Sequence, residues 1–174
     1  LFYPCSKQPH NKGVNMPNWT SNSVLFVGKE NQLKKLQTML KSDDNDFDFN
    51  NIIPMPEELR HTRSGSEDIK PDWQKKQSKE LKAKYGADDW YDWSVNNWGT
   101  KWNSVDTEVE QRDGTLIYRF NTAWDCPRNI AEALLRMQKT ILQDIKISWD
   151  CVHEDGDEEE TIIDIEAEYD IQAS

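Results

Sequence analysis

Few of the residues in this chain that could bind a metal or act in catalysis stand at the spacing that such a site requires. Cys151 and His153 are two residues apart, and Asp155 and Asp157 follow them. A tetrahedral zinc site needs four ligands, and no further cysteine or histidine stands at a recognisable distance from this pair. Strand alternation instead places Cys151 and His153 on one face with apolar residues. We therefore predict no metal site and no bound cofactor.

A second candidate is the alternation of Asp44, Asp46 and Asp48, which is typical of the start of a calcium-binding loop. The sixth position of such a loop requires glycine and the twelfth a bidentate glutamate, but Phe49 and Met55 stand there. The pattern therefore predicts a solvated turn.

Nucleophilic catalysis requires a base beside the nucleophile. His10, His61 and His153 stand in no recognisable motif, and carboxylates are so abundant that no single pair is informative. We predict no catalytic residue, and a protein that is not an enzyme.

The three cysteines, Cys5, Cys126 and Cys151, are too few and too irregularly spaced for a disulfide framework. This favours a reducing cytoplasm. Residues 1–15 have no charged segment followed by an apolar one, so they do not form a secretory signal. We expect them to be a leader or remnant outside the fold, with Met16 as the true start. No run approaches the length of a membrane span.

Charge is distributed unevenly along the chain. The net charge is −11, no Lys or Arg follows Lys146, and residues 147–174 hold eleven of the 32 acidic residues. Such a segment repels phosphate and attracts basic surfaces, so we expect no direct nucleic-acid binding. The predicted partner-binding residues are eight acids of this segment: Asp157, Glu158, Glu159, Glu160, Asp164, Glu166, Glu168 and Asp170.

Hydrophobic periodicity predicts the elements that position these residues. The predicted strands are 19–27, a short extended piece at 47–53, a hairpin turning at Asp113–Gly114, and strands at 145–151 and 163–169. Three helices are predicted: one at 30–41, a basic one capped by Asp72 and ended by Gly86, and one opened by Pro127. The last helix carries an apolar stripe of Ile130, Ala131, Leu134, Leu135, Ile141 and Leu142.

The most aromatic stretch is residues 88–102, which contain the aromatic residues Trp90, Tyr91, Trp93, Trp98 and Trp102. Asp88 or Asp89 can cap a short helix here, and Gly99 fits the left-handed residue that ends it. Two interpretations remain open. The rings are core that anchors the segment to a sheet, or they form a partly exposed groove for a peptide or a base, with polar contacts from Asn96, Asn97 and Lys101.

Together these elements predict an α+β two-layer sandwich. We expect one domain over 16–174, with a ferredoxin-like antiparallel sheet, two helices on one face and a helical Trp-rich insertion at 57–104.

Four strings resemble the YubB-like family of bacteriophage and conjugative-plasmid proteins. They are MPNWTSNSVLFVG from Met16, IIPMPEEL from Ile52, DWYDWSVNNWGTKW from Asp89 and FNTAWDCP from Phe120. The resemblance implies a mobile-element origin and a ferredoxin-like domain, and it transfers no catalytic residue. The family tends to have cysteine where this chain has Thr20, which argues against a required thiol at that position.

We therefore predict a cytoplasmic, non-enzymatic protein of a mobile element that binds a host protein with a basic surface. Carboxylates on every second strand residue repeat at about 7 Å, close to two phosphate steps of one DNA strand. One form of the hypothesis is thus a DNA mimic that inhibits a host defence nuclease; the plainer reading is a solvated sheet face. The alternatives are an enzyme, indicated by a carboxylate of raised pKa near 90–102, and a single-stranded nucleic-acid binder, indicated by exposed aromatics beside the lysines of 75–84.

Overall fold

The computed structural model describes residues 18–64, 71–154 and 159–163. The predicted leader and much of the acidic segment lie outside these ranges. So do six of the eight predicted partner-binding acids, namely Asp157, Glu158, Asp164, Glu166, Glu168 and Asp170.

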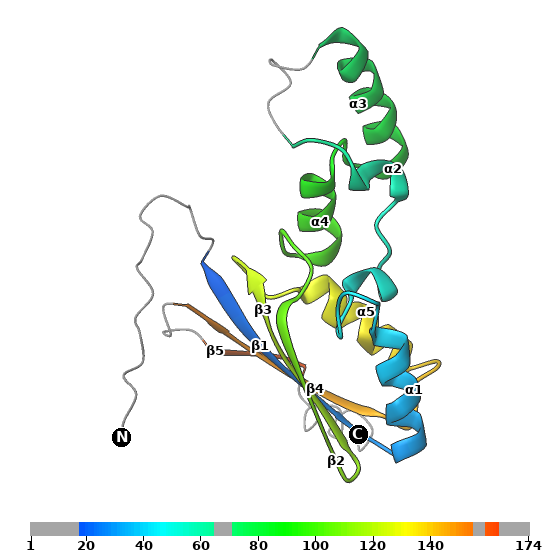
Figure 1. The fold of residues 1–174 in the computed structure, drawn as a ribbon, viewed down its shortest axis with the longest axis vertical. Coiled ribbons are helices and arrows are strands. Elements are labelled where there is room, and N and C mark those ends of the chain that lie inside the picture. Colours follow the sequence, from blue (N-terminus) through cyan, green and yellow to red (C-terminus); the bar gives the residue numbers. More distant parts are fainter. Residues whose placement is uncertain (1–17, 65–70, 155–158, 164–174) are drawn as a thin grey trace, which may run out of the picture.

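The described chain forms a five-stranded antiparallel sheet in the order β2-β3-β1-β4-β5 (Figure 1). The central strand β1 (Trp19–Val27) pairs with β3 (Thr115–Ala123) on one side and β4 (Lys146–His153) on the other. The edges are β2 (Val105–Arg112) and β5 (Glu159–Ile163). The prediction of an α+β protein built on an antiparallel sheet is confirmed.

The finer prediction of a ferredoxin-like sheet is not confirmed, because the sheet has five strands rather than four. The predicted short strand at 47–53 is wrong. That segment is a loop containing one 3₁₀ turn, η1 (Phe49–Asn51), in which the Asn50 N–H donates to the Asp48 carboxylate. The last strand begins at Glu159 rather than 163, because Glu159 and Glu160 pair with β4 instead of forming a turn.

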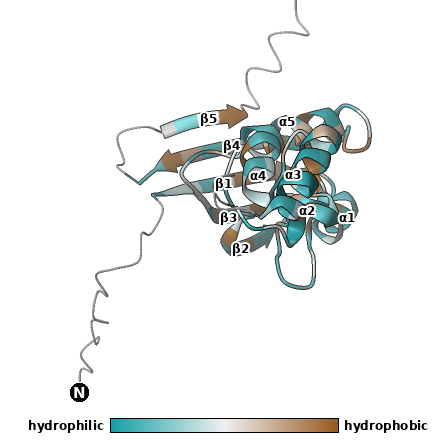
Figure 2. Ribbon diagram, turned by 90° about the horizontal axis from the view of Figure 1, so that it is seen from above, coloured by the Kyte–Doolittle hydropathy of each residue, from teal (hydrophilic) through white to brown (hydrophobic). Residues whose placement is uncertain are grey.

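Five α-helices accompany the sheet, and Figure 1 shows them on one side of the strands. They are α1 (Glu30–Leu40), α2 (Glu57–Arg60), α3 (Asp72–Tyr85), α4 (Trp90–Trp98) and α5 (Arg128–Gln138). Their colouring in Figure 2 shows that α3 is largely hydrophilic, and Figure 1 shows it projecting away from the sheet beyond α4.

The core lies between the sheet and α1 with α5. Alternate residues of the central strands, such as Phe26, Tyr118 and Trp149, are fully buried in one cluster with Leu36 of α1 and Leu134 of α5. Alternation places these strand residues on one face, so the pattern read from the sequence describes the buried side of the sheet correctly.

The layer over the sheet contains more than the two predicted helices. Phe47, from the loop after α1, is fully buried, and its ring centroid lies 4.9 Å from those of Tyr118 and Phe120 and 6.0 Å from that of Trp149. The alternation that suggested a strand at 47–53 is real, since Phe49 is buried beside Phe47. The alternation arises because the loop crosses the face of the sheet. A segment on the face packs its side chains against the sheet and cannot pair with a strand through its backbone.

The helix ends of α3 and α4 follow the predicted chemistry in three of four cases. The Asp89 carboxylate accepts the Asp92 N–H at 2.9 Å and caps α4, and Gly86 and Gly99 end α3 and α4 in the left-handed conformation. The predicted Asp72 cap is wrong: Pro71 is the N-cap residue, and no side chain caps α3.

The predicted apolar stripe of the last helix is too long. α5 ends at Gln138, and its stripe residue Ile130 is fully buried, but Ile141 lies beyond the helix with 66% of its surface exposed.

Candidate binding surface and sulfur cluster

Segments far apart in the sequence meet at the end of the sheet where β1 begins and β3 ends. The Trp98 indole N–H donates to the Ile53 carbonyl at 2.9 Å, and the Thr100 hydroxyl donates to the Ala123 carbonyl at 2.8 Å. The Trp124 N–H donates to the Asn18 carbonyl at 2.8 Å. These bonds bring together parts of all four strings quoted in the sequence analysis.

A group of aromatic rings surrounds one lysine at this end. We call it the aromatic–lysine cluster; its members are Trp19, Tyr91, Lys101, Trp102 and Trp124. The Lys101 ammonium lies 4.5 Å from the ring centroid of Trp102, 4.9 Å from that of Trp124 and 5.8 Å from that of Tyr91. All three distances are within the range of a cation–π contact.

Trp124 is the most exposed ring of the cluster, with 43% of its surface accessible. Its φ is +77°, a left-handed conformation that costs a non-glycine residue about 1–3 kcal/mol. The strand pairing before it and the tertiary hydrogen bond from its N–H to Asn18 hold it there. The fold therefore presents a large apolar ring to solvent on a strained backbone.

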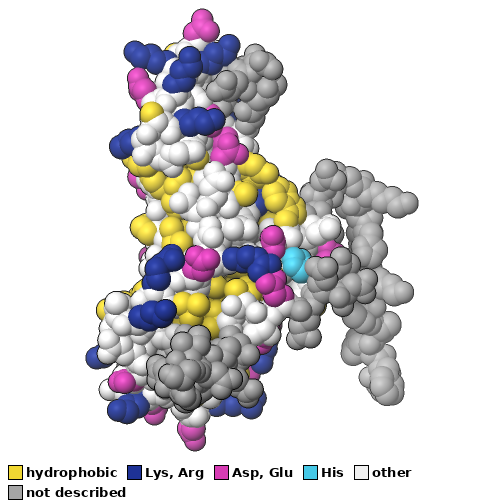
Figure 3. All heavy atoms as spheres, turned by 180° about the vertical axis from the view of Figure 1, so that it is seen from behind, with side chains coloured by type: hydrophobic (Ala, Val, Ile, Leu, Met, Phe, Trp, Pro, Cys, Tyr) yellow, Lys and Arg dark blue, Asp and Glu magenta, His cyan; other side chains and the backbone are white. Residues whose placement is uncertain are grey.

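The predicted aromatic segment divides into core and surface. Trp93 and Trp98 are buried, with ring centroids 5.6 Å apart, so the core interpretation holds for these two. Trp90, Tyr91 and Trp102 are only partly buried. Figure 3 shows hydrophobic side chains exposed on one face, between basic side chains over α3 and charged groups around a histidine.

Of the three polar residues predicted to serve this segment, only Lys101 is in the cluster. The Asn97 side chain donates to the Trp93 carbonyl of its own helix at 2.9 Å. The Asn96 carbonyl accepts from the Asn129 side chain at 2.9 Å, which ties α4 to α5.

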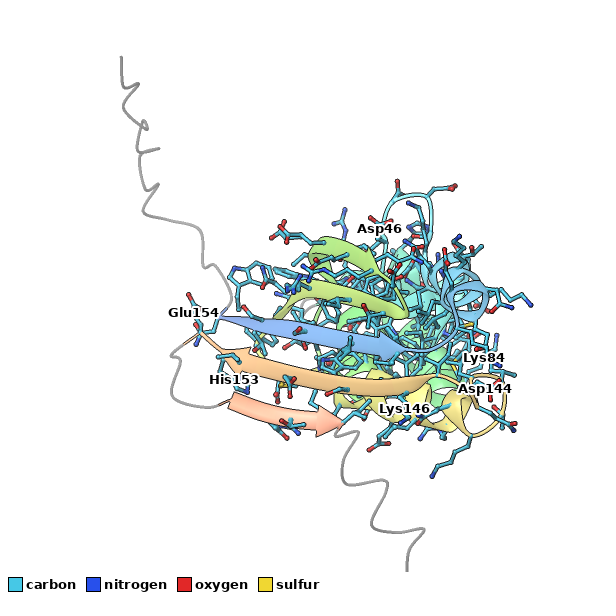
Figure 4. All side chains as sticks on the ribbon, turned by 90° about the horizontal axis from the view of Figure 1, so that it is seen from below. Asp46, Lys84, Asp144, Lys146, His153 and Glu154 are labelled. Carbon is cyan, nitrogen blue, oxygen red and sulfur yellow. A yellow bond between two sulfur atoms is a disulfide. The ribbon has the colours of Figure 1, made fainter. Side chains whose placement is uncertain are left out.

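A second group of side chains lies next to the aromatic–lysine cluster. We call it the sulfur cluster; its members are Asp125, Cys126, Cys151 and His153. Cys126 and Cys151 form a disulfide with a Cα–Cα distance of 6.3 Å, a single bridge in a chain whose cysteines do not predict a disulfide framework. The His153 Nε2 lies 3.9 Å from the Cys126 sulfur and 3.9 Å from an Asp125 carboxylate oxygen. Its Nδ1 lies 3.3 Å from the Thr20 hydroxyl. Figure 4 shows His153 at the end of β4, beside the starts of β1 and β5.

Among the predicted partner-binding acids, Glu160 is the one whose side chain is described. Arg128 donates to both of its carboxylate oxygens, which lowers the pKa of Glu160. Glu159 lies in β5 and pairs with Val152. The charge of Glu160 is therefore already matched within the protein.

Two of the three aspartates that resembled a calcium loop, Asp46 and Asp48, have structural partners. Asp46 accepts from the Lys41 ammonium at 2.7 Å, and Asp48 accepts from the Asn103 side chain at 2.7 Å. These carboxylates fasten the loop that carries Phe47 to its neighbours.

A cleft of about 500 Å³ lies between α2 and α3. Its lining includes Glu58, His61 and Trp73, of which Trp73 is 69% exposed. Lys84 donates to the Glu58 carboxylate at 2.8 Å, and this bond is the main reason that the pKa of Glu58 falls to about 2.

We expect the Glu58 carboxyl to titrate near pH 2, measured by NMR of the side-chain carboxyl carbon, and Lys84→Met to raise that midpoint toward the ordinary value of 4.5. Because the pKa is lowered in the folded state, the stabilisation is present above pH 4.5 and is lost as the pH falls toward 2. Lys82→Met, on the same helix, should leave the midpoint unchanged. A wild-type midpoint near 4.5 would contradict the ion pair.

Comparisons of the chain with protein-family models, with curated proteins and with solved structures find no match. None of the described helices is both long enough and apolar enough to cross a membrane.

Proposed function

We propose that the chain is a non-enzymatic binding protein that contacts a host protein through the aromatic–lysine cluster. The observation that carries the proposal is the Trp124 ring, which is 43% exposed on a strained backbone and adjoins Lys101 and Tyr91. Trp and Tyr dominate the energetics of protein interfaces because they bury a large area and lose little conformational entropy.

The acidic segment 147–174 supplies the second part of the proposal. Eleven acids without a base attract a partner with a basic surface and accelerate its association, and the aromatic rings then hold it. If the partner is a nucleic-acid enzyme, the segment acts as a DNA mimic in its basic groove. Within this proposal the protein is cytoplasmic and belongs to a mobile element, as the resemblance to the YubB-like family implies.

The charge state of Glu58 in the cleft supports binding rather than catalysis by this carboxylate. An acid–base catalyst needs a carboxylate whose pKa is raised. Lys84 donates to the Glu58 carboxylate and lowers its pKa to about 2.

For the fold, we infer that β1 to β4 with α1 and α5 form a ferredoxin-like core to which β5 has been added. The position of β1 between β3 and β4, antiparallel to both, supports this inference. The helical segment 57–104 is then an insertion before β2.

The test is capture of partners from host lysate at two salt concentrations, followed by affinity measurement with the purified partner. Trp124→Gly removes the ring and suits the left-handed backbone, so the fold is retained. We expect it to weaken binding about 30-fold, the effect of losing roughly 2 kcal/mol at an interface hot spot. Lys101→Ala should weaken binding less.

Trp73→Ala is the matched control, because it removes a still more exposed tryptophan from α3. It should leave the affinity unchanged. Changing Asp164, Glu166, Glu168 and Asp170 to Asn or Gln should slow association and abolish its salt dependence. Equal binding by wild type and Trp124→Gly would refute the aromatic contact, and tight binding of a single-stranded oligonucleotide would refute the choice of a protein partner.

A further inference from the structure

The sulfur cluster contains a donor set that the sequence separates widely. Asp125 and Cys126 end the turn after β3, whereas Cys151 and His153 lie 25 or more positions later on β4. Two sets of possible ligand atoms each lie within 4.8 Å of one another: Asp125, Cys126 and His153, and Cys126, Cys151 and Glu160. The Cys126 sulfur belongs to both sets.

The distance between the Cys126 sulfur and the His153 ring is close to that of a zinc site. The Cys151 sulfur belongs to the other set, so its ligation requires the Cys151 side chain to rotate once the disulfide is open. With zinc–sulfur bonds of about 2.3 Å and zinc–nitrogen bonds of about 2.0 Å, a tetrahedral site separates sulfur from nitrogen by roughly 3.5 Å. The Cys126 sulfur and the His153 Nε2 are 3.9 Å apart. The same geometry separates two sulfurs by roughly 3.8 Å, which requires the disulfide to be reduced.

His153 is already oriented for ligation. A proton on Nδ1 can be donated to the Thr20 hydroxyl, 3.3 Å away, which leaves the Nε2 lone pair facing Cys126 and Asp125. Such a partner on the second ring nitrogen is typical of zinc-bound histidines. Thr20 itself is buried on β1, so the orientation is built into the sheet.

We propose that the reduced protein binds one zinc ion through Cys126, Cys151, His153 and Asp125. A disulfide oxidant, which takes up two electrons and becomes a dithiol, re-forms the Cys126–Cys151 bond and releases the ion. A dithiol reductant supplies two electrons, breaks the sulfur–sulfur bond and becomes a disulfide, which leaves two cysteine thiols. Zinc then displaces the two thiol protons, while the neutral imidazole and the carboxylate complete the tetrahedron. In a reducing compartment a cysteine pair of this kind more often binds a metal than remains a disulfide.

Glu160 is excluded as the fourth ligand by its pairing with Arg128. Asp125 is more accessible, with 56% of its side chain exposed, and one of its carboxylate oxygens lies 3.9 Å from the His153 Nε2 that it would join at the metal. The two carboxylates therefore provide a matched test of the assignment.

The experiment uses the full chain with Cys5→Ser, so that Cys126 and Cys151 are its only thiols. Oxidised and reduced protein are titrated with zinc in competition with a chromophoric chelator, and with cobalt to record thiolate-to-metal absorption. We expect one metal per reduced chain and at least 100-fold weaker binding by oxidised chain. Cys126→Ser and His153→Ala should abolish tight binding, and Thr20→Val should weaken it 10- to 100-fold.

Glu160→Gln should bind zinc as wild type does, whereas Asp125→Asn should bind it at least tenfold more weakly; the reverse result would overturn the assignment of Asp125. Tryptophan fluorescence monitors the fold throughout. If reduction unfolds the chain, zinc should restore the native signal, and failure to restore it would overturn the proposal. Equal zinc affinity of wild type and Cys126→Ser would also overturn it.

Discussion

Replacing Phe47 by alanine is expected to lower the free energy of unfolding by about 3–5 kcal/mol, the range for removal of a buried phenylalanine ring. Phe47 is fully buried and contacts rings from both β3 and β4. The neighbouring rings are themselves held by the sheet, so they cannot collapse into the cavity and most of the loss persists. Urea denaturation followed by tryptophan fluorescence measures the change.

Two variants make the Phe47 result specific. Phe47→Leu keeps much of the volume and should lose less stability than Phe47→Ala. Ile141→Ala removes a comparable apolar side chain that is 66% exposed, and surface changes of this kind stay within about 0.5 kcal/mol. A loss below about 1 kcal/mol in Phe47→Ala would show that the loop after α1 is not part of the core.

The second large effect is expected at Gly99, and Gly86 provides its control. Both residues end helices with positive φ, +86° and +77° respectively, so alanine at either position incurs roughly 1–2 kcal/mol of backbone strain. At Gly99 the added Cβ would also lie 3.2 Å from the Arg128 nitrogen, whereas at Gly86 nothing lies within 4 Å. Overpacking adds about 1–3 kcal/mol at Gly99 alone.

The comparison of the two glycine variants by urea denaturation therefore isolates the contact between the end of α4 and the start of α5. Gly99→Ala should be less stable than Gly86→Ala by at least 1 kcal/mol. Equal losses would mean that the two segments do not pack closely. Because Lys101 and Trp102 follow Gly99, we also expect Gly99→Ala to weaken partner binding more than Gly86→Ala does.

The sequence was sufficient wherever structure depends on near neighbours. The bounds of β1, the left-handed glycines that end α3 and α4, the Asp89 cap and the turn at Asp113–Gly114 all match the prediction. Caps, turns and hydrophobic alternation involve contacts within a few residues, so residue type and spacing are enough to specify them.

Local patterns misled where tertiary packing decided the outcome. Phe47 and Phe49 alternate as in a strand, but the segment crosses the face of the sheet and forms a 3₁₀ turn. The stripe toward Ile141 continues in the sequence after α5 has ended. Phe47 and Phe49 are buried as the pattern requires, and the space over the sheet determined the conformation of their backbone, whereas Ile141 is exposed.

Neither candidate site could be read from spacing alone. Cys126 and Cys151 are 25 residues apart, and Thr20 is 133 residues from His153. These four residues meet because β1 pairs with β4 on one side and with β3 on the other. Trp124, which follows β3, and Lys101, which follows α4, likewise meet only in the tertiary structure. The sequence by itself determined most of the elements, several of their ends and the charge of the chain, since these depend on neighbouring residues. Only the tertiary structure decided which distant side chains share a surface, because strand order is set by the packing of the whole core.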